Sequence, residues 1–147
     1  MEIQVINGEL IEALHEQARV NERRRVNYDL RTTPEDGSQR MLNVLEVGTR
    51  IPIHRHEKTS ETIICLEGCL DWIVYEEIAD AEAGAKVDAE AEERKALEQG
   101  FREVARYRLC PREKAYGIQV PPMTWHSVEV IEPSTILEAK DGKYEKK

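Results

Sequence analysis

Two histidines and a glutamate lie close together in the sequence at a spacing that suits metal binding. His54 and His56 are two residues apart, so on an extended segment both side chains leave the same face. Glu61 follows five residues later, which leaves room for a turn and a second strand. His126 adds a third imidazole just after the prolines at 121–122. Three imidazoles and one carboxylate suit a divalent Fe, Mn, Ni, Co or Zn ion, whereas Mg²⁺ and Ca²⁺ prefer oxygen ligands alone.

These residues resemble the cupin superfamily. Every fixed position of the first cupin motif, G-x5-H-x-H-x4-E-x6-G, is occupied, by Gly48, His54, His56, Glu61 and Gly68. The second motif, G-x5-P-x-G-x2-H-x3-N, is half present. Pro121 and His126 fit it, while Met123 replaces the usual glycine and Val130 the usual asparagine. The resemblance implies one metal held by the three histidines and Glu61.

A narrower resemblance is to the WbuC-like cupin metalloproteins, which occur in bacterial surface-polysaccharide contexts. It is carried by residues 39–43, 54–56, 120–126 and 140–144. Outside an insertion described below, it covers residues 20–145. It implies a carbohydrate-related ligand.

The composition predicts a single soluble domain over residues 1–147, a length that supports one hydrophobic core. No stretch approaches the roughly 18 apolar residues of a membrane span, and residues 1–9 lack the features of an export signal. We therefore expect a cytoplasmic protein with no membrane partner. The net charge of −8 argues against nucleic-acid binding, and the basic residues 23–25 are interpreted as a solvated helix end.

Three cysteines, Cys65, Cys69 and Cys110, are an odd number in a chain without an export signal. A disulfide framework is therefore not expected. We interpret all three as reduced thiols and place Cys65 inside the barrel.

Hydrophobic periodicity predicts a short amphipathic helix over residues 9–20, with Leu10, Leu14 and Ala18 on one stripe. His15 belongs to this helix and is not expected to bind the metal. Turn-forming residues predict hairpins at 67–69, where Gly68 takes a positive φ, and at 132–134. The predicted strands cover residues 39–47, two runs within 61–75, 101–109, 116–120, 126–131 and 135–140.

Residues 76–100 are rich in Ala, Glu and Lys and poor in large apolar residues. This composition predicts an exposed, acidic helical insertion without a role in the chemistry, the alternative being a lid or docking arm. The barrel strands then fall within residues 39–75 and 101–140. Seven or eight strands joined by short turns predict an all-β fold, an antiparallel double-sheet jelly-roll barrel with a short N-terminal helix.

Residues on or beside the predicted strands are candidates for a substrate pocket. Polar ones such as Arg40 and Gln119 can equally face solvent, and Trp125 can equally be a packing residue rather than a stacking surface for a sugar. The pocket candidates are Arg40, Gln119, Trp125 and Glu138. The candidates for a catalytic acid or base are Glu138, Lys140, Tyr144 and Arg40.

Two functions fit these residues. The first is a metalloenzyme that isomerises, epimerises or oxygenates a small polar metabolite, and the family resemblance points to a sugar or sugar derivative. The second is a non-catalytic metal-containing sensor or binding barrel, because a fold does not decide function. In both cases we expect a homodimer formed through an edge strand or the N-terminal segment.

Overall fold

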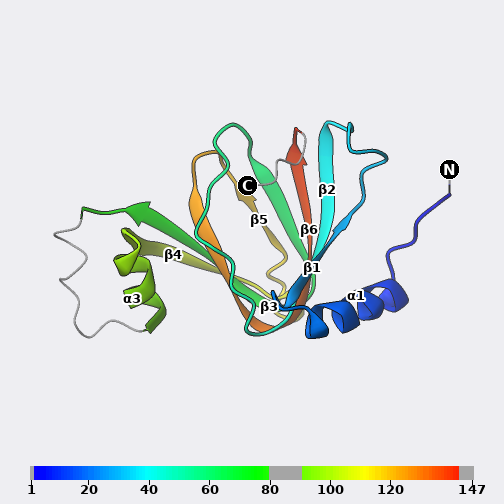
Figure 1. Cartoon of the computed structure of the whole chain (residues 1–147), viewed down its shortest axis with the longest axis horizontal. Helices are drawn as coiled ribbons and strands as arrows, with labels where there is room; N and C mark the ends of the chain where they lie inside the picture. Colours follow the sequence, from blue (N-terminus) through cyan, green and yellow to red (C-terminus); the bar gives the residue numbers. More distant parts are fainter. Residues whose placement is uncertain (1, 80–90, 143–147) are drawn as a thin grey trace.

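The computed structural model describes residues 2–79 and 91–142, and residues 91–94 by their backbone alone (Figure 1). The elements are α1 Gly8–Val20, β1 Arg25–Asp29, β2 Ser38–Leu45, β3 Glu61–Glu77, α3 Ala91–Glu98, β4 Phe101–Leu109, the 3-10 turn η1 Pro111–Glu113, β5 Gly117–Val120 and β6 Trp125–Asp141. The sheet has the strand order β1-β2-β6-β3-β4, and β5 pairs with β3. Every pairing between two of these strands is antiparallel, and the predicted all-β jelly-roll class is confirmed.

The predicted hairpins at 67–69 and 132–134 are wrong. Residues 67–69 lie inside the continuous strand β3, and residues 132–134 lie inside the continuous strand β6. β3 and β6 pair with each other along their length, with register shifts between Cys65 and Leu70. Such irregularities accommodate both a glycine at positive φ and a proline that has no N–H to donate. The turn-forming residues therefore mark bends within strands, and Figure 1 shows both ribbons curving there.

Gly68 sits at this bend and makes it possible. Its φ is +94°, as predicted. A Cβ on Gly68 would lie 2.3 Å from the carbonyl oxygen of Pro133 and 2.4 Å from Oγ of Ser134. Ser134 is fully buried, and its Oγ accepts a hydrogen bond from the N–H of Cys69 at 3.0 Å. The two bent strands thus touch through their backbones.

The bend folds the sheet over its own apolar face. The main core combines residues from both halves of the folded sheet: Leu45, Ile63, Cys65, Leu70, Trp72, Leu109, Val120, Val128, Val130 and Ile136. On the outer face, Leu14 and Ala18 of α1 pack against Leu42 and Val44 of β2, with Leu10 partly buried beside them. The predicted helix and its apolar stripe are therefore confirmed.

His15 anchors α1 to the sheet and lies apart from the other histidines. Its Nδ1 is 2.7 Å from Glu46 Oε2, and its Nε2 is 3.1 Å from both Thr135 Oγ1 and Glu67 Oε1. These partners follow β2 or belong to β6 and β3, so one buried imidazole ties the helix to three strands. Glu46 takes part in this network, and β2 accordingly ends at Leu45, two residues before the predicted end.

The interpretation of residues 23–25 as a helix end is wrong. The helix stops at Val20 with Asn21 as its C-cap, Arg24 has a φ of +58°, and Arg25 begins β1. β1 was not predicted, because five residues on the sheet's edge show too little periodicity to be distinguished from a loop.

The predicted insertion at 76–100 is partly a strand and partly a packed helix. β3 continues to Glu77, and α3 confirms the helical prediction over its own length. Ala96 and Leu97 are buried and α3 contacts β4, so this portion is not simply exposed. Residues 80–90 of the predicted insertion lie outside the described residues.

Among the described residues, neither helix combines the length and the apolar character needed to cross a membrane.

We expect Gly68→Ala to lower the free energy of unfolding by about 3 kcal/mol, since it adds a steric clash to an unfavourable left-handed backbone. Gly100→Ala is the matched control: its φ is +87°, but a Cβ there meets nothing within 4 Å. It should lose only about 1 kcal/mol. Urea unfolding of the metal-free proteins measures both values, and equal losses would show that the contact with Pro133 does not constrain the bend.

Candidate metal centre

The three motif histidines converge where the start of β6 meets the segment between β2 and β3. His54 lies in the segment between β2 and β3, and an isolated bridge joins it to His126, the second residue of β6. The N–H of His54 donates to the carbonyl of His126 at 3.0 Å, and the reciprocal bond is 2.9 Å. The ring centroids of His54 and His126 are 4.2 Å apart, and that of His56 lies 5.3 Å from His54. The segment around His54 and His56 is therefore not a continuous strand, and its β pairing is limited to the bridge at His54.

Backbone carbonyls orient two of the rings. The Nδ1 of His54 is 2.9 Å from the carbonyl oxygen of Pro52, and the Nδ1 of His126 is 2.9 Å from that of Thr124. A carbonyl can only accept, so each Nδ1 carries the proton and donates it. Each Nε2 therefore keeps its lone pair, in the arrangement by which outer hydrogen bonds prepare histidines for metal ligation.

Glu61 brings a buried carboxylate to the same place. Its Oε1 is 3.3 Å from Nε2 of His126 and 3.5 Å from Nε2 of His56. Glu61 is 1% exposed, and among the described residues no group donates a hydrogen bond to either of its carboxylate oxygens. A buried carboxylate without donors is unfavourable unless it is protonated or bound to a cation. This orphaned group beside imidazole lone pairs fits a transition-metal site.

Glu138 of β6 extends the cluster. One ligand atom from each of His54, His56 and His126 lies within 4.8 Å of the others, and the same holds for His56, Glu61 and Glu138. The two groups overlap at His56. The structure therefore brings together all four predicted metal ligands and one predicted pocket residue.

Burial and neighbouring charges set the protonation of these groups. Burial, followed by the neighbouring Glu138 carboxylate, raises the pKa of Glu61 to about 9. For Glu138 burial raises the pKa, but Glu61 and the Asn43 amide outweigh it, so the net pKa is lowered. Burial and His54 lower the pKa of His126 to about 4. At neutral pH His126 is therefore uncharged and able to bind a metal, while Glu61 holds a proton that a metal would displace.

Asn43 and Gln39 share the interior face of β2 and were missed by the sequence analysis. Asn43 Nδ2 donates to Glu138 Oε2 at 3.0 Å, and Gln39 is 2% exposed with an Oε1 that accepts no hydrogen bond from the described residues. Arg40 points to the opposite face, where its guanidinium pairs with Asp36 at 2.8 Å. Arg40 is thus not part of the cluster. Strand alternation shows that Arg40 lies on the face of β2 opposite to Gln39 and Asn43. Only the packing of Leu42 on α1 shows that the face with Gln39 and Asn43 is the interior one.

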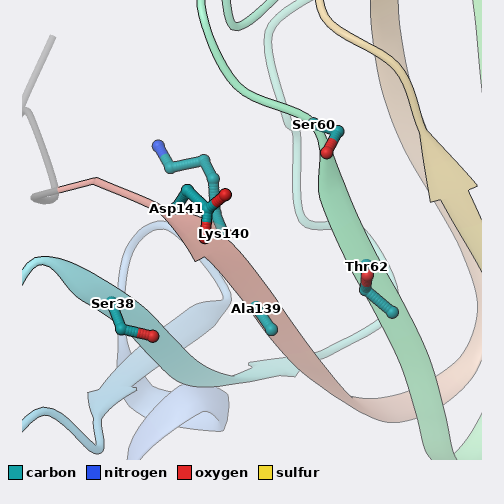
Figure 2. Close-up of a pocket in the computed structure, with 6 residues that line it drawn as sticks. All are labelled: Ser38, Ser60, Thr62, Ala139, Lys140 and Asp141. Carbon is teal, nitrogen blue, oxygen red and sulfur yellow. The ribbon is translucent and has the colours of Figure 1, made fainter.

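Gln119 also lies outside the cluster. Thr62 Oγ1 donates to Gln119 Oε1, and Thr62 faces away from the neighbouring Glu61. Thr62 belongs to a separate pocket of about 210 Å³ at the ends of β2, β6 and β3 (Figure 2). This pocket is lined by Ser38, Ser60, Thr62, Ala139, Lys140 and Asp141.

The remaining predicted residues differ in their placement. Trp125 lies under the guanidinium of Arg55, whose Cζ is 4.4 Å from the ring centroid, and packs against Phe101. It therefore has a packing role beside His126. Lys140 is opposite Glu61 in the β3–β6 register, and Tyr144 lies outside the described residues.

Two further features shape the histidine wall. The ring of Trp72 stacks on His126 with centroids 4.9 Å apart and an interplanar angle of 16°. Met123, which replaces the motif glycine, nevertheless adopts a φ of +67°. Its N–H donates to the carbonyl of His56 at 2.8 Å, so the turn keeps the left-handed geometry and holds the His56 backbone. Sequence alternation could have suggested Trp72, since it shares a face with Val74 and Leu70.

Comparison with solved structures identifies the class of fold. The chain is similar to KdgF from Halomonas sp., with a TM-score of 0.52 and 13% identity over 86% of this chain and 84% of that chain. A cupin 2 domain-containing protein from Halorhodospira halophila gives a TM-score of 0.54 and 12% identity over 83% and 67%. L-ribose isomerase from Cellulomonas parahominis gives 0.57 and 13% over 82% and 62%. The chain therefore has the cupin fold.

The sequence also matches the model of one protein family. The model described as a domain of unknown function, DUF6016, matches residues 6–87, which is more than half of the chain. The chain belongs to this family. No curated protein sequence matches it.

We expect Glu61→Gln to abolish metal binding but to change the unfolding free energy of the metal-free protein by less than about 1 kcal/mol at pH 7. The reason is that the Glu61 pKa of about 9 leaves the group neutral, so Gln replaces one uncharged side chain by another. Glu57→Gln, at an exposed position just before β3, is the control and should keep the metal. Elemental analysis and thermal unfolding measure the two effects, and full metal content in the Glu61 variant would contradict the assignment.

Proposed function

We propose that the chain is a divalent-metal-binding cupin that acts as an enzyme on a small polar metabolite, a sugar or sugar derivative. The observation that carries this proposal is the convergence of His54, His56, His126 and Glu61 beside a second carboxylate. This site would hold one transition-metal ion. Four protein ligands on a metal that prefers octahedral coordination leave positions open for substrate. A metal held there would polarise a substrate oxygen, or bind dioxygen if it is Fe(II).

Glu138 is the candidate general base. Its carboxylate is oriented by the Asn43 amide, and its lowered pKa keeps it ionised at neutral pH. It lies within the same 4.8 Å group as Glu61 and His56, so a substrate at the centre would meet it directly. A carboxylate in this position can remove a proton from a carbon next to a carbonyl and return it, which is the requirement for isomerisation or epimerisation.

Two similarities favour a carbohydrate substrate. The motif segments resemble WbuC-like cupins of surface-polysaccharide contexts, and one protein of similar fold is an L-ribose isomerase. We propose a role in bacterial surface-polysaccharide metabolism and a cytoplasmic location. Isomerase or epimerase chemistry is the first expectation, and oxygenation the second.

The test is to incubate protein loaded with Fe, Mn, Ni, Co or Zn with aldoses, ketoses and nucleotide sugars in D₂O. We expect new sugar signals by NMR and solvent deuterium at the carbon next to the carbonyl. Oxygen consumption would instead identify an oxygenase. Glu138→Gln should keep the metal and lower turnover by about 10² to 10⁴-fold.

Glu129→Gln is the matched control for that variant. It lies on the same strand, but its carboxylate pairs with Arg106 at 2.6 Å outside the cluster, so turnover should be unchanged. Undiminished turnover by metal-free protein would refute the metalloenzyme proposal. Thermal shifts with sugars but no product would favour the non-catalytic binding barrel.

We also propose a homodimer. β1 lies at an edge of the sheet, and the N-terminal segment beside it carries Ile3 and Val5, which are 93% and 64% exposed. Edge strands and exposed apolar residues favour association with a second copy. Sedimentation at micromolar concentration should show a dimer, and removal of residues 2–6 should weaken it. A monomeric full chain would contradict this proposal.

A further inference from the structure

A second group of metal-binding side chains lies away from the histidines. The β3–β4 register places Leu70 opposite Leu109, so the adjoining Cys69 lies beside Cys110. One ligand atom from each of Cys69, Cys110 and Glu113 lies within 4.8 Å of the others. Both thiols are buried, at 2% and 0% exposed, whereas Glu113 is exposed. The group shares no residue with the candidate centre.

We propose that Cys69, Cys110 and Glu113 form a second metal site, specific for a thiophilic divalent ion of the Zn²⁺ class. Two thiolates and a carboxylate are zinc ligands, and a water can complete a tetrahedron. Thiolate donors select against Mg²⁺ and Ca²⁺, which take oxygen ligands. This proposal does not depend on the proposed function of the histidine site.

The local fold positions the carboxylate over the thiols. Cys110 precedes the 3-10 turn η1, and the N–H of Glu113 donates to the carbonyl of Cys110 at 2.9 Å. This closed turn brings Glu113 back beside Cys110. Glu113 also lines a surface cavity of about 430 Å³ together with Asp71, Arg106, Arg108 and Ala115. The cavity opens the Glu113 side of the group to solvent.

A metal ion would have to displace the thiol protons. Burial and the neighbouring Cys69 raise the pKa of Cys110 to about 11, so the thiol is protonated without a metal. Binding one M²⁺ ion forms two metal–sulfur bonds and one metal–oxygen bond and releases both thiol protons to solvent. Arg112, which pairs with Glu132, and Arg108, which pairs with Asp71 at 2.8 Å, lie near the cysteines, and Arg112 favours the Cys110 thiolate.

Cys65 provides an internal control. It is also buried, but its Sγ donates to the carbonyl oxygen of Glu67 at 3.2 Å and it is not in the three-ligand group. The proposal therefore distinguishes two of the three cysteines from the third.

The experiment is a Co²⁺ titration of the reduced, metal-free protein, followed by absorbance. Thiolate-to-cobalt charge transfer gives an intense near-ultraviolet band that a site of histidine and glutamate cannot produce. We expect the band in the natural protein, in His54→Ala and in Cys65→Ser, and its loss in the double variant Cys69→Ser/Cys110→Ser. Zn²⁺ should displace the cobalt and remove the band.

Glu113→Gln guards against misfolding of the double variant, since the side chain is exposed. With its circular dichroism unchanged, it should keep the band but bind Co²⁺ at least about tenfold more weakly, because a carboxylate ligand becomes a neutral amide. Absence of the band in the natural protein, or its loss in Cys65→Ser alone, would overturn the proposal. Mass spectrometry showing a Cys69–Cys110 disulfide under reducing conditions would also overturn it.

Discussion

The contact between Gly68 and the Pro133–Ser134 backbone is the constraint on which both groups of ligands depend. β3 carries Glu61 before this bend, while β6 carries His126 before it and Glu138 after it. Folding the two paired strands together brings His126 within 3.3 Å of Glu61, although the two residues are far apart in the β3–β6 register. Cys69, which follows Gly68, lies next to the end of β4 because Leu70 pairs with Leu109. A side chain at residue 68 would clash with the carbonyl oxygen of Pro133 and push the two strands apart.

The histidine cluster combines polar groups that are unfavourable together in an apolar interior. Glu61 and Glu138 are neighbours inside the sheet. The raised pKa of Glu61 and the lowered pKa of Glu138 leave only Glu138 charged at neutral pH, which relieves their repulsion. The Asn43 amide adds one compensating hydrogen bond, and the Glu61 oxygens receive none from the described residues. A cation bound there would compensate the Glu138 charge and displace the Glu61 proton, which is why this cluster is a candidate metal site.

The sequence predictions succeeded where a local pattern has one physical reading. The apolar stripe of residues 9–20 indicated a helix, and α1 covers Gly8–Val20. Motif spacing named four candidate ligands, which remain candidates. The sequence predictions failed where the same residue pattern occurs in two different local structures. Glycine and proline mark hairpins and strand bulges alike, so residues 67–69 and 132–134 were assigned to the wrong one. Alternation likewise could not decide between Arg40 and the interior set of Gln39 and Asn43.

The sequence by itself determined which side chains are able to bind a metal, because ligand chemistry belongs to residue types and their spacing follows from strand periodicity. Only the tertiary structure decided which of these side chains meet. Glu138 joins the cluster, and Cys69 lies beside Cys110, through contacts between strands that are distant in the chain. Such contacts depend on how the bent strands pack and on which face α1 covers, and no local pattern records either.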